Sequence, residues 1–151
     1  AGAAAPAAAQ SARLVLVAAA ALVRGRSVLL AQRPEGKPMA GLYEFPGGKV
    51  EEGETPEQAL ARELKEELAI GCDPADCKPL CFASHGYKKK DADFHLLMPV
   101  FVVDQFEGEP EPVEGQTLVW ASAADLDKYE MPEADVPLIA PLKRYLEART
   151  E

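Results

Sequence analysis

The run from Gly48 to Ile70 reads GKVEEGETPEQALARELKEELAI, and its residue spacing constrains the fold more than any other part of the chain. At 3.6 residues per helical turn, Glu63, Glu66 and Glu67 stand at i, i+3 and i+4, so their carboxylates lie together on about one turn. Leucines spaced four residues apart fall on another face. The run therefore predicts a helix with an apolar face for the core and a crowded acidic face.

The expected helix has clear start signals. Thr55 stands at the N-cap position, Pro56 at the first helical position, and Gln58 three residues after the cap, as in a capping box. We expect the helix to extend from about Pro56 to Ala69, directly after a loop that contains a pair of glycines.

Carboxylates crowded on one helical turn repel each other by a few tenths of a kcal/mol per pair on an exposed helix. A divalent metal ion is the natural compensation, because carboxylate oxygens suit the hard ions Mg²⁺, Mn²⁺ and Ca²⁺. The alternative is a solvated acidic face without a ligand. The glycine pair and the capped helix start beside the acids favour the metal site.

The spacing also matches a known pattern, G-x5-E-x7-R-E-U-x-E-E-x-G-U, in which U is an aliphatic residue. The chain resembles the Nudix family, whose box this pattern is, and fills it with Gly48, Glu54, Arg62, Glu63, Leu64, Glu66, Glu67, Ala69 and Ile70. Ala69 replaces the glycine that ends the helix in the pattern. We expect a shifted helix end, with Gly71 in the left-handed conformation instead. The resemblance implies an α/β protein, an α/β/α sandwich with a mixed β-sheet.

The resemblance further implies a hydrolase that splits a phosphoanhydride with the help of a metal ion. By this family pattern, Glu63, Glu66 and Glu67 bind Mg²⁺ together with the backbone carbonyl of Gly48. Mn²⁺ is expected to substitute for Mg²⁺.

The same resemblance gives roles to other charged residues. Arg62 is expected to orient Glu63 through an ion pair, which its planar guanidinium suits. Glu63 or Glu66 is the expected general base. Glu114 is expected to act as an additional ligand or base from outside the box, with a solvated loop carboxylate as the open alternative.

Segments beyond the box, among them EGQTLVW and MPEADVPLI, resemble the MutT-type branch of the family, whose members remove diphosphate from nucleoside triphosphates. That resemblance implies that Arg33 meets phosphate, that Phe45 lies beside the base and that Asp135 reads the edge of the base. Without the family, Phe45 is also interpretable as a core aromatic. Phe94 is a candidate stacking residue, and the alternative is a half-buried aromatic at the start of a strand beside a loop. The expected reaction converts 8-oxo-dGTP and water into 8-oxo-dGMP and diphosphate.

Asp135 leaves the preferred base open. An ionised carboxylate only accepts hydrogen bonds, whereas a carboxyl group kept protonated by burial also donates one, as the reading of oxidised guanine requires. Ionised Asp135 would suit the exocyclic amine of cytosine, so a CTP or 5-methyl-dCTP pyrophosphohydrolase is one alternative. A Nudix module that binds a nucleotide without hydrolysis is another. Asp135 could also be the N-cap of a last helix, since Pro137 follows two residues later.

Length and charge narrow the function classes. The chain has 151 residues and a formal net charge of −9, and we expect a leader over residues 1–12 followed by one domain over residues 13–151. The acidic balance argues against a nucleic acid polymer as partner but is compatible with a nucleotide whose charge metal ions neutralise. No apolar run reaches the ~18 residues of a membrane span, so no membrane partner is expected.

Three cysteines, Cys72, Cys77 and Cys81, precede His85 at spacings that fit no standard zinc motif. A zinc site is one interpretation, and reduced, unpaired thiols in an intracellular compartment are the favoured one. We accordingly expect a protein of the cytoplasm or of the matrix or stroma of an organelle.

Apolar runs predict the remaining elements. We expect a hairpin of strands at 14–23 and 28–31, an extended piece at 43–45, strands at 78–85, 94–103 and 117–121, and a last helix at 136–149. A charged loop at 88–93 is expected between two of these strands. This alternation predicts a mixed sheet covered by helices on both faces.

Overall fold

The computed structural model describes residues 13–89 and 92–150, so the expected leader at residues 1–12 lies outside the described residues. The elements in chain order are β1 (Arg13–Arg24), β2 (Ser27–Gln32), β3 (Tyr43–Glu44), β4 (Gly47–Lys49), α1 (Pro56–Leu68), η1 (Pro74–Asp76), β5 (Lys78–Lys89), β6 (Ala92–Val103), β7 (Thr117–Ser122), η2 (Ala123–Lys128), η3 (Glu133–Leu138) and α2 (Ile139–Ala148). Within these residues, none of the helices is long and apolar enough to cross a membrane.

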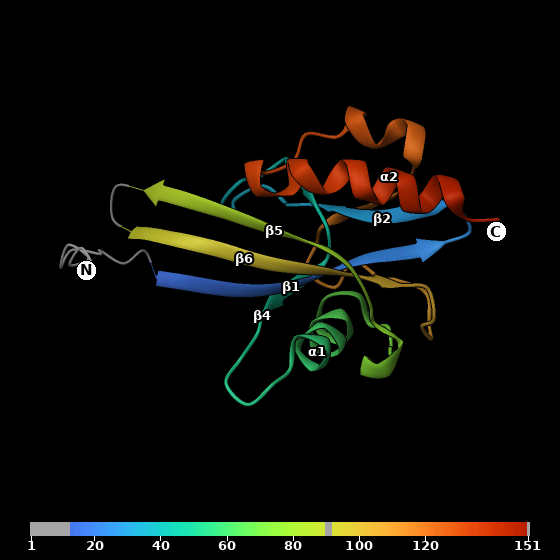
Figure 1. The fold of residues 1–151 in the computed structure, drawn as a ribbon, viewed down its shortest axis with the longest axis horizontal. Helices are drawn as coiled ribbons and strands as arrows, with labels where there is room; N and C mark the ends of the chain where they lie inside the picture. The colour runs from blue at the N-terminus through green and yellow to red at the C-terminus, as the bar shows by residue number, and fades with distance from the viewer. Residues whose placement is uncertain (1–12, 90–91, 151) are drawn as a thin grey trace, which may run out of the picture.

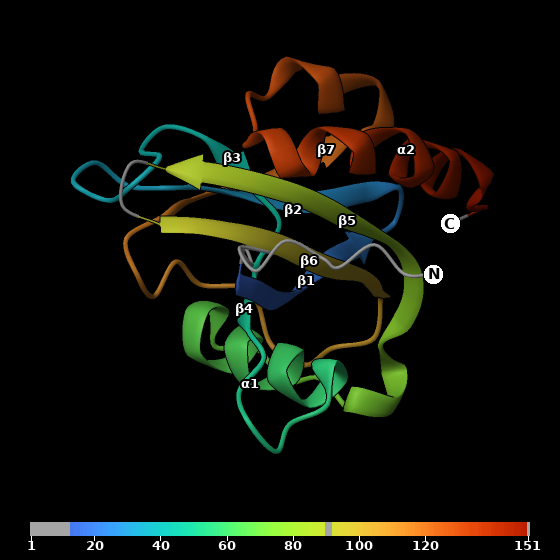
Figure 2. The same ribbon diagram turned by 60° about the vertical axis from the view of Figure 1, so that its left-hand side comes forward.

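Within the described residues the strands form one seven-stranded mixed sheet, in which β3, β2, β1, β6 and β5 follow one another. Strand β4 pairs with β1, and β7 pairs with β2. The long strands β1 and β6 run parallel, whereas β5 and β6 run antiparallel. Helix α1 covers one face of the sheet and α2 the other (Figures 1 and 2). The predicted α/β/α sandwich with a mixed sheet is therefore confirmed.

Strand β1 lies at the centre of the sheet and is apolar on both faces. Its side chains alternate between two core clusters, as expected for a strand with helices on either side. Ala18, Ala20 and Leu22 pack with Leu60, Leu64 and Leu68 of α1, whereas Ala19, Ala21 and Val23 pack with Leu142 and Leu146 of α2. This burial on both faces explains why the alanine-rich segment forms a strand despite its helix propensity.

Helix α1 begins as expected and ends differently. Thr55 is the N-cap, and its side chain and that of Gln58 complete the capping box. At the other end Ala69 itself adopts the left-handed conformation, with φ 58° and ψ 31°, and donates its N–H to the carbonyl of Lys65. The expectation of a left-handed Gly71 was wrong. Gly71 instead exchanges two backbone hydrogen bonds with Glu107, of 2.9 and 2.8 Å, which require extended backbone there.

Two further expectations need correction. The expected charged loop at 88–93 is mostly strand, since Lys88 pairs with Asp93 in the β5–β6 ladder; residues 90 and 91 lie outside the described residues. The last α-helix begins at Ile139, because the segment before it is the 3₁₀ helix η3. Pro137 lies inside η3 and disfavours α-helical backbone at the preceding residue.

Candidate active site

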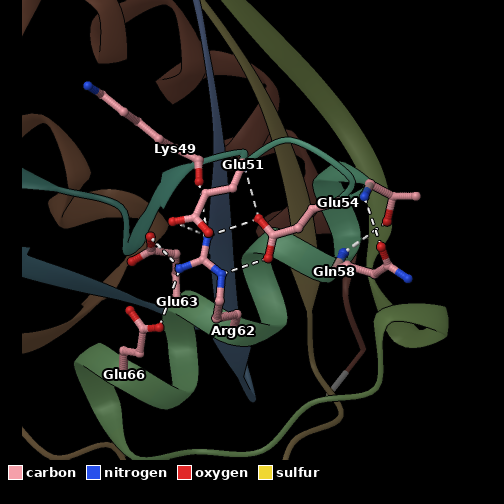
Figure 3. A network of polar contacts seen from close by, with 8 residues as sticks. Lys49, Glu51, Glu54, Gln58, Arg62, Glu63 and Glu66 are labelled. Atoms are coloured by element: carbon pink, nitrogen blue, oxygen red, sulfur yellow. Dashed lines mark hydrogen bonds and ion pairs between the residues drawn. The ribbon is translucent and has the colours of Figure 1, made fainter.

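Arg62 is the centre of a polar network between α1 and the loop that follows β4 (Figure 3). Its Nε donates to Oε2 of Glu54 at 2.7 Å, and its Nη2 donates to Oε1 of Glu54 at 3.0 Å and to the carbonyl of Lys49 at 3.1 Å. Its Nη1 donates to Glu63 at 3.1 Å and to Glu66 at 3.4 Å. The expected contact between Arg62 and Glu63 is therefore present as a single hydrogen bond. The carboxylate that Arg62 binds through both of its oxygens is that of Glu54.

Glu54 received no role from the sequence, although it is part of the box. Its Oε1 also accepts the N–H of Glu51 at 2.9 Å, and its own N–H donates to the carbonyl of Glu51 at 3.0 Å. The hydrogen bonds from Arg62, and then from Glu51, hold the pKa of Glu54 below its usual value. Glu54 thus stabilises the turn within the loop between β4 and α1 through Glu51, and it links this loop to the helix through Arg62.

Gly48 is the residue of β4 that lies against the side chain of Glu63 in α1. Its partner in the antiparallel β1–β4 pair is Ala18. A Cβ atom at position 48 would lie 2.3 Å from the carboxylate of Glu63, inside van der Waals contact. Only glycine therefore leaves room for Glu63 between strand and helix, which explains why the pattern begins with a glycine.

Glu67 lies in an environment short of positive charge. Burial raises its pKa to about 9, helped by the hydrogen bond it donates to Glu63 when protonated and by repulsion from Glu63 and Glu114. The N–H of Gly47 opposes the shift. Carboxylates that repel one another supply the oxygen donors and the negative charge that suit a hard divalent cation.

These carboxylates are not arranged as a finished ligand set. Among the described residues, no three His, Cys, Asp or Glu side chains are gathered closely enough to hold a metal ion. Arg62 occupies one oxygen of Glu63 and one of Glu66, and the side chain of Glu66 is 56% exposed. By charge and donor type the residues fit a divalent cation, and binding one would require these side chains to turn.

Glu114 reaches the acidic cluster because Gln116, a residue that the sequence analysis passed over, fixes its loop. The buried side chain of Gln116 donates to the carbonyl of Glu67 at 3.1 Å and accepts the N–H of Glu114 at 2.8 Å. Val113 also donates its N–H to the carbonyl of Glu67, at 3.2 Å. The loop before β7 is thus anchored on the last turn of α1, where Glu114 contributes to the raised pKa of Glu67.

A cavity of about 490 Å³ opens beside this cluster, large enough for a nucleotide base and sugar. The predicted residues that line it are Arg33, Phe45, Gly48, Glu67, Phe94, Glu114 and Asp135. The other predicted residues, Arg62, Glu63 and Glu66, adjoin the cavity from the α1 side of Gly48. The structure therefore brings residues from distant parts of the chain to one place.

Asp135 also lines this cavity and is only 6% exposed. Burial raises its pKa to about 7, and repulsion from Glu44 adds to the shift. Arg33 and the backbone N–H of Phe45 lower it. Asp135 lies inside η3, whose N-cap is Pro132, and the N-cap of α2 is Leu138, so the alternative N-cap role is wrong.

Glu44 and Tyr87 shape the cavity without having been singled out by any sequence pattern. The Nε of Arg33 lies 2.9 Å from Glu44 without hydrogen-bond alignment, while its Nη2 donates to Glu44 at 3.1 Å. Tyr87 stacks on Phe94 at 5.1 Å between ring centroids, and its hydroxyl accepts the N–H of Ala134 at 3.3 Å. Tyr87 pairs with Phe94 across the β5–β6 ladder. A prediction of this strand pairing was the signal needed to place Tyr87 at the cavity.

The fold and the site together define a class: an α/β/α protein with an acidic cluster, suited to cations, at the mouth of a nucleotide-sized cavity. Comparison with known proteins agrees, since the NUDIX domain family matches residues 14–142. The chain is 39% identical over 127 residues to the CTP pyrophosphohydrolase of Escherichia coli K12, covering 84% of this chain and 90% of that protein.

Two further relatives support the assignment. The chain is 39% identical over 120 residues to the 8-oxo-dGTP diphosphatase of the same organism, covering 78% of this chain and 86% of that protein. The solution structure of the E. coli ORF135 protein superposes with a TM-score of 0.74 at 35% identity, covering 92% of this chain and 95% of that one. The chain belongs to the Nudix hydrolase family, whose members generally use a divalent metal ion.

Proposed function

We propose that this protein is a Mg²⁺-dependent nucleoside triphosphate pyrophosphohydrolase that converts 8-oxo-dGTP and water into 8-oxo-dGMP and diphosphate. The observation that carries the proposal is that one cavity is lined both by the acids Glu67 and Glu114 and by the buried Asp135. Mn²⁺ substitutes for Mg²⁺ in the same oxygen site. The substrate is a free nucleotide, in keeping with the net charge of −9.

The chemistry is divided among residues of the box and the loop that carries Glu114. Glu63, Glu66 and Glu67, with the carbonyl of Gly48 and with Glu114, would hold Mg²⁺, which when bound neutralises phosphate charge and makes water more acidic. Glu63 or Glu66 accepts the proton of the attacking water.

Arg62 positions these acids. It keeps Glu63 and Glu66 on one side of the helix while Glu54 holds the guanidinium itself in place.

Four further aromatic or charged side chains that line the cavity receive the nucleotide. Phe45 and Phe94 flank the base, and Arg33 meets phosphate once it exchanges its partner Glu44 for the substrate. Asp135 has a pKa raised to about 7, so a large fraction is protonated near neutral pH and offers both a donor and an acceptor to an oxidised guanine.

A pyrimidine substrate is the second candidate, because the same pKa leaves much of Asp135 ionised and able to accept from the exocyclic amine of cytosine. A relative with 39% identity is named a CTP pyrophosphohydrolase. A module that only binds nucleotides is disfavoured, since all the box acids are present.

The test compares kcat/KM for 8-oxo-dGTP, 2-hydroxy-dATP, CTP and 5-methyl-dCTP with Mg²⁺. We expect the highest value for 8-oxo-dGTP; a preference for the cytosine nucleotides would establish the second candidate. Glu66→Gln should abolish turnover without affecting the fold, because the Glu66 side chain is 56% exposed. Glu52→Gln, at an exposed loop position, is the control and should retain full activity. Unchanged turnover in Glu66→Gln would contradict the assigned roles.

A further inference from the structure

Cys72 and Cys77 lie at the two ends of one tight turn that joins α1 to β5. Their Sγ atoms are 3.9 Å apart and both thiols are free. A disulfide has an S–S distance of about 2.05 Å, so formation of the bond requires the two sulfurs to approach by roughly 2 Å.

The turn is already closed by hydrogen bonds before any covalent link forms. Asp73 caps η1 by accepting the N–H of Ala75 on its carboxylate at 2.9 Å. The N–H of Asp76 donates to the carbonyl of Asp73 at 2.8 Å, and that of Cys77 to the carbonyl of Pro74 at 3.2 Å. The entropy of bringing the two cysteines together is therefore largely lost on folding, which favours their reaction with each other.

The two thiols differ in access and acidity. Cys77 is 7% exposed and packs in the core below α1. Cys72 is half-buried and lines a surface pocket together with Asp73 and Asp76. The hydrogen bond from the Cys77 thiol lowers the pKa of Cys72 and raises that of Cys77, which makes Cys72 the sulfur that ionises.

We propose that Cys72 and Cys77 are a redox-active dithiol, in which Cys72 reacts with a neutral hydroperoxide and Cys77 then closes an intramolecular disulfide. The charges around the pair favour a neutral oxidant. Asp73 and Asp76 act on Cys72, and Glu57 and Asp76 act on Cys77, so an anionic oxidant is repelled from both sulfurs.

The reaction balances with one hydroperoxide for each pair of thiols. The Cys72 thiolate attacks one peroxide oxygen, the O–O bond breaks, and the leaving hydroxide takes a proton to become water. The Cys77 sulfur then attacks the resulting sulfenic sulfur; the S–S bond forms, the S–O bond breaks, and hydroxide leaves with the thiol proton as a second water. Two thiols are oxidised and H₂O₂ is reduced to two waters. A thiol reductant reverses the link.

The alternative of a zinc site has less support in this turn. Among the described residues, no third His, Cys, Asp or Glu side chain joins Cys72 and Cys77 closely enough to complete a ligand set. A pair of sulfurs in contact without further ligands is the arrangement that a disulfide requires.

The experiment treats the full chain with a small excess of H₂O₂ in the presence of EDTA, followed by intact mass and non-reducing peptide mapping. We expect a mass loss of two hydrogens and a single linked peptide pair that contains Cys72 and Cys77. Cys81, on β5, is the third cysteine of the chain. Cys81→Ser is therefore the matched control and should give the same product. Cys72→Ser and Cys77→Ser should each fail to lose two hydrogens.

A second readout does not depend on mapping. The oxidised chain should melt several degrees above the dithiothreitol-treated chain, because the bond constrains the unfolded state, and only Cys72→Ser and Cys77→Ser should lose this difference. Retention of three free thiols after peroxide treatment, or a bond that involves Cys81, would overturn the proposal. Neither outcome depends on the nucleotide hydrolysed.

Discussion

Arg62 and Glu54 form a two-pronged ion pair, with hydrogen bonds of 2.7 and 3.0 Å, that joins helix α1 to the loop after β4. The remaining donors of Arg62 reach Glu63, Glu66 and the carbonyl of Lys49. Three acids of the box, Glu54, Glu63 and Glu66, are thus arranged around one guanidinium group. Arg62 also connects helix α1 to the end of β4 and to the loop that follows it.

Arg62→Lys is expected to lower kcat by roughly 10- to 100-fold, the usual effect of losing a group that positions metal ligands. A lysine ammonium is a single point charge and cannot hold Glu54 and Glu63 in the same geometry. Steady-state kinetics with Mg²⁺ measures the effect. Arg144→Lys, at an exposed position of α2, is the control with the same chemistry and should behave as the wild type. Equal kcat values for Arg62→Lys and Arg144→Lys would show that Arg62 does not position the metal ligands.

Gly48→Ala is expected to reduce activity more than stability. The added Cβ would lie 2.3 Å from the Glu63 carboxylate, which can swing away, so Glu63 is displaced while the strand stays. Kinetics and thermal melting of the same samples separate the two effects. Gly71→Ala adds a methyl group into open space and should change neither. If Gly48→Ala lowered the melting temperature strongly and left Glu63 in place, the result would contradict this account.

Asp135→Asn is expected to stabilise the protein more at pH 8 than at pH 5. Burial raises the pKa of Asp135 to about 7, so the folded state binds its proton more tightly than the unfolded state. Stability from this group is therefore full below about pH 4 and is lost as pH rises towards 7. Urea unfolding measures the change in the free energy of unfolding that the substitution causes. This change should be about 2 kcal/mol more favourable at pH 8 than at pH 5. An identical effect at both pH values would mean that Asp135 titrates normally.

Ala69→Gly is expected to raise the free energy of unfolding by about 1 kcal/mol, because Ala69 has φ 58° and glycine adopts this conformation without steric cost. Chemical denaturation measures the change. Ala61→Gly, in the right-handed interior of α1, is the opposite control and should lower stability by about 0.5–1 kcal/mol. The same sign in both variants would argue against a strained helix end.

Much of the helix and its charged residues could be predicted from the sequence, because capping and residue spacing are local. Thr55 and Gln58 meet within one turn, and the leucines of α1 recur every four residues, so no distant contact was needed to predict them. The central hairpin of β1 and β2 was predictable for the same reason.

Other features depend on contacts between distant parts of the chain. The local sequence allows Gly71 to adopt the left-handed conformation at the end of the helix. In the folded protein Gly71 pairs with Glu107 in extended conformation, and Ala69 adopts the left-handed conformation instead. Gln116 matters only because the folded loop brings it to the carbonyl of Glu67.

The sequence by itself determined the box helix, its cap and the acids on one of its turns, because these rest on interactions between residues at most a few positions apart. Only the tertiary structure decided that Glu44 would face Arg33, that Tyr87 would stack on Phe94, and that burial would raise the pKa of Asp135. Pairings across a sheet and the loss of solvent around a carboxyl group arise from packing, and a linear pattern does not contain them.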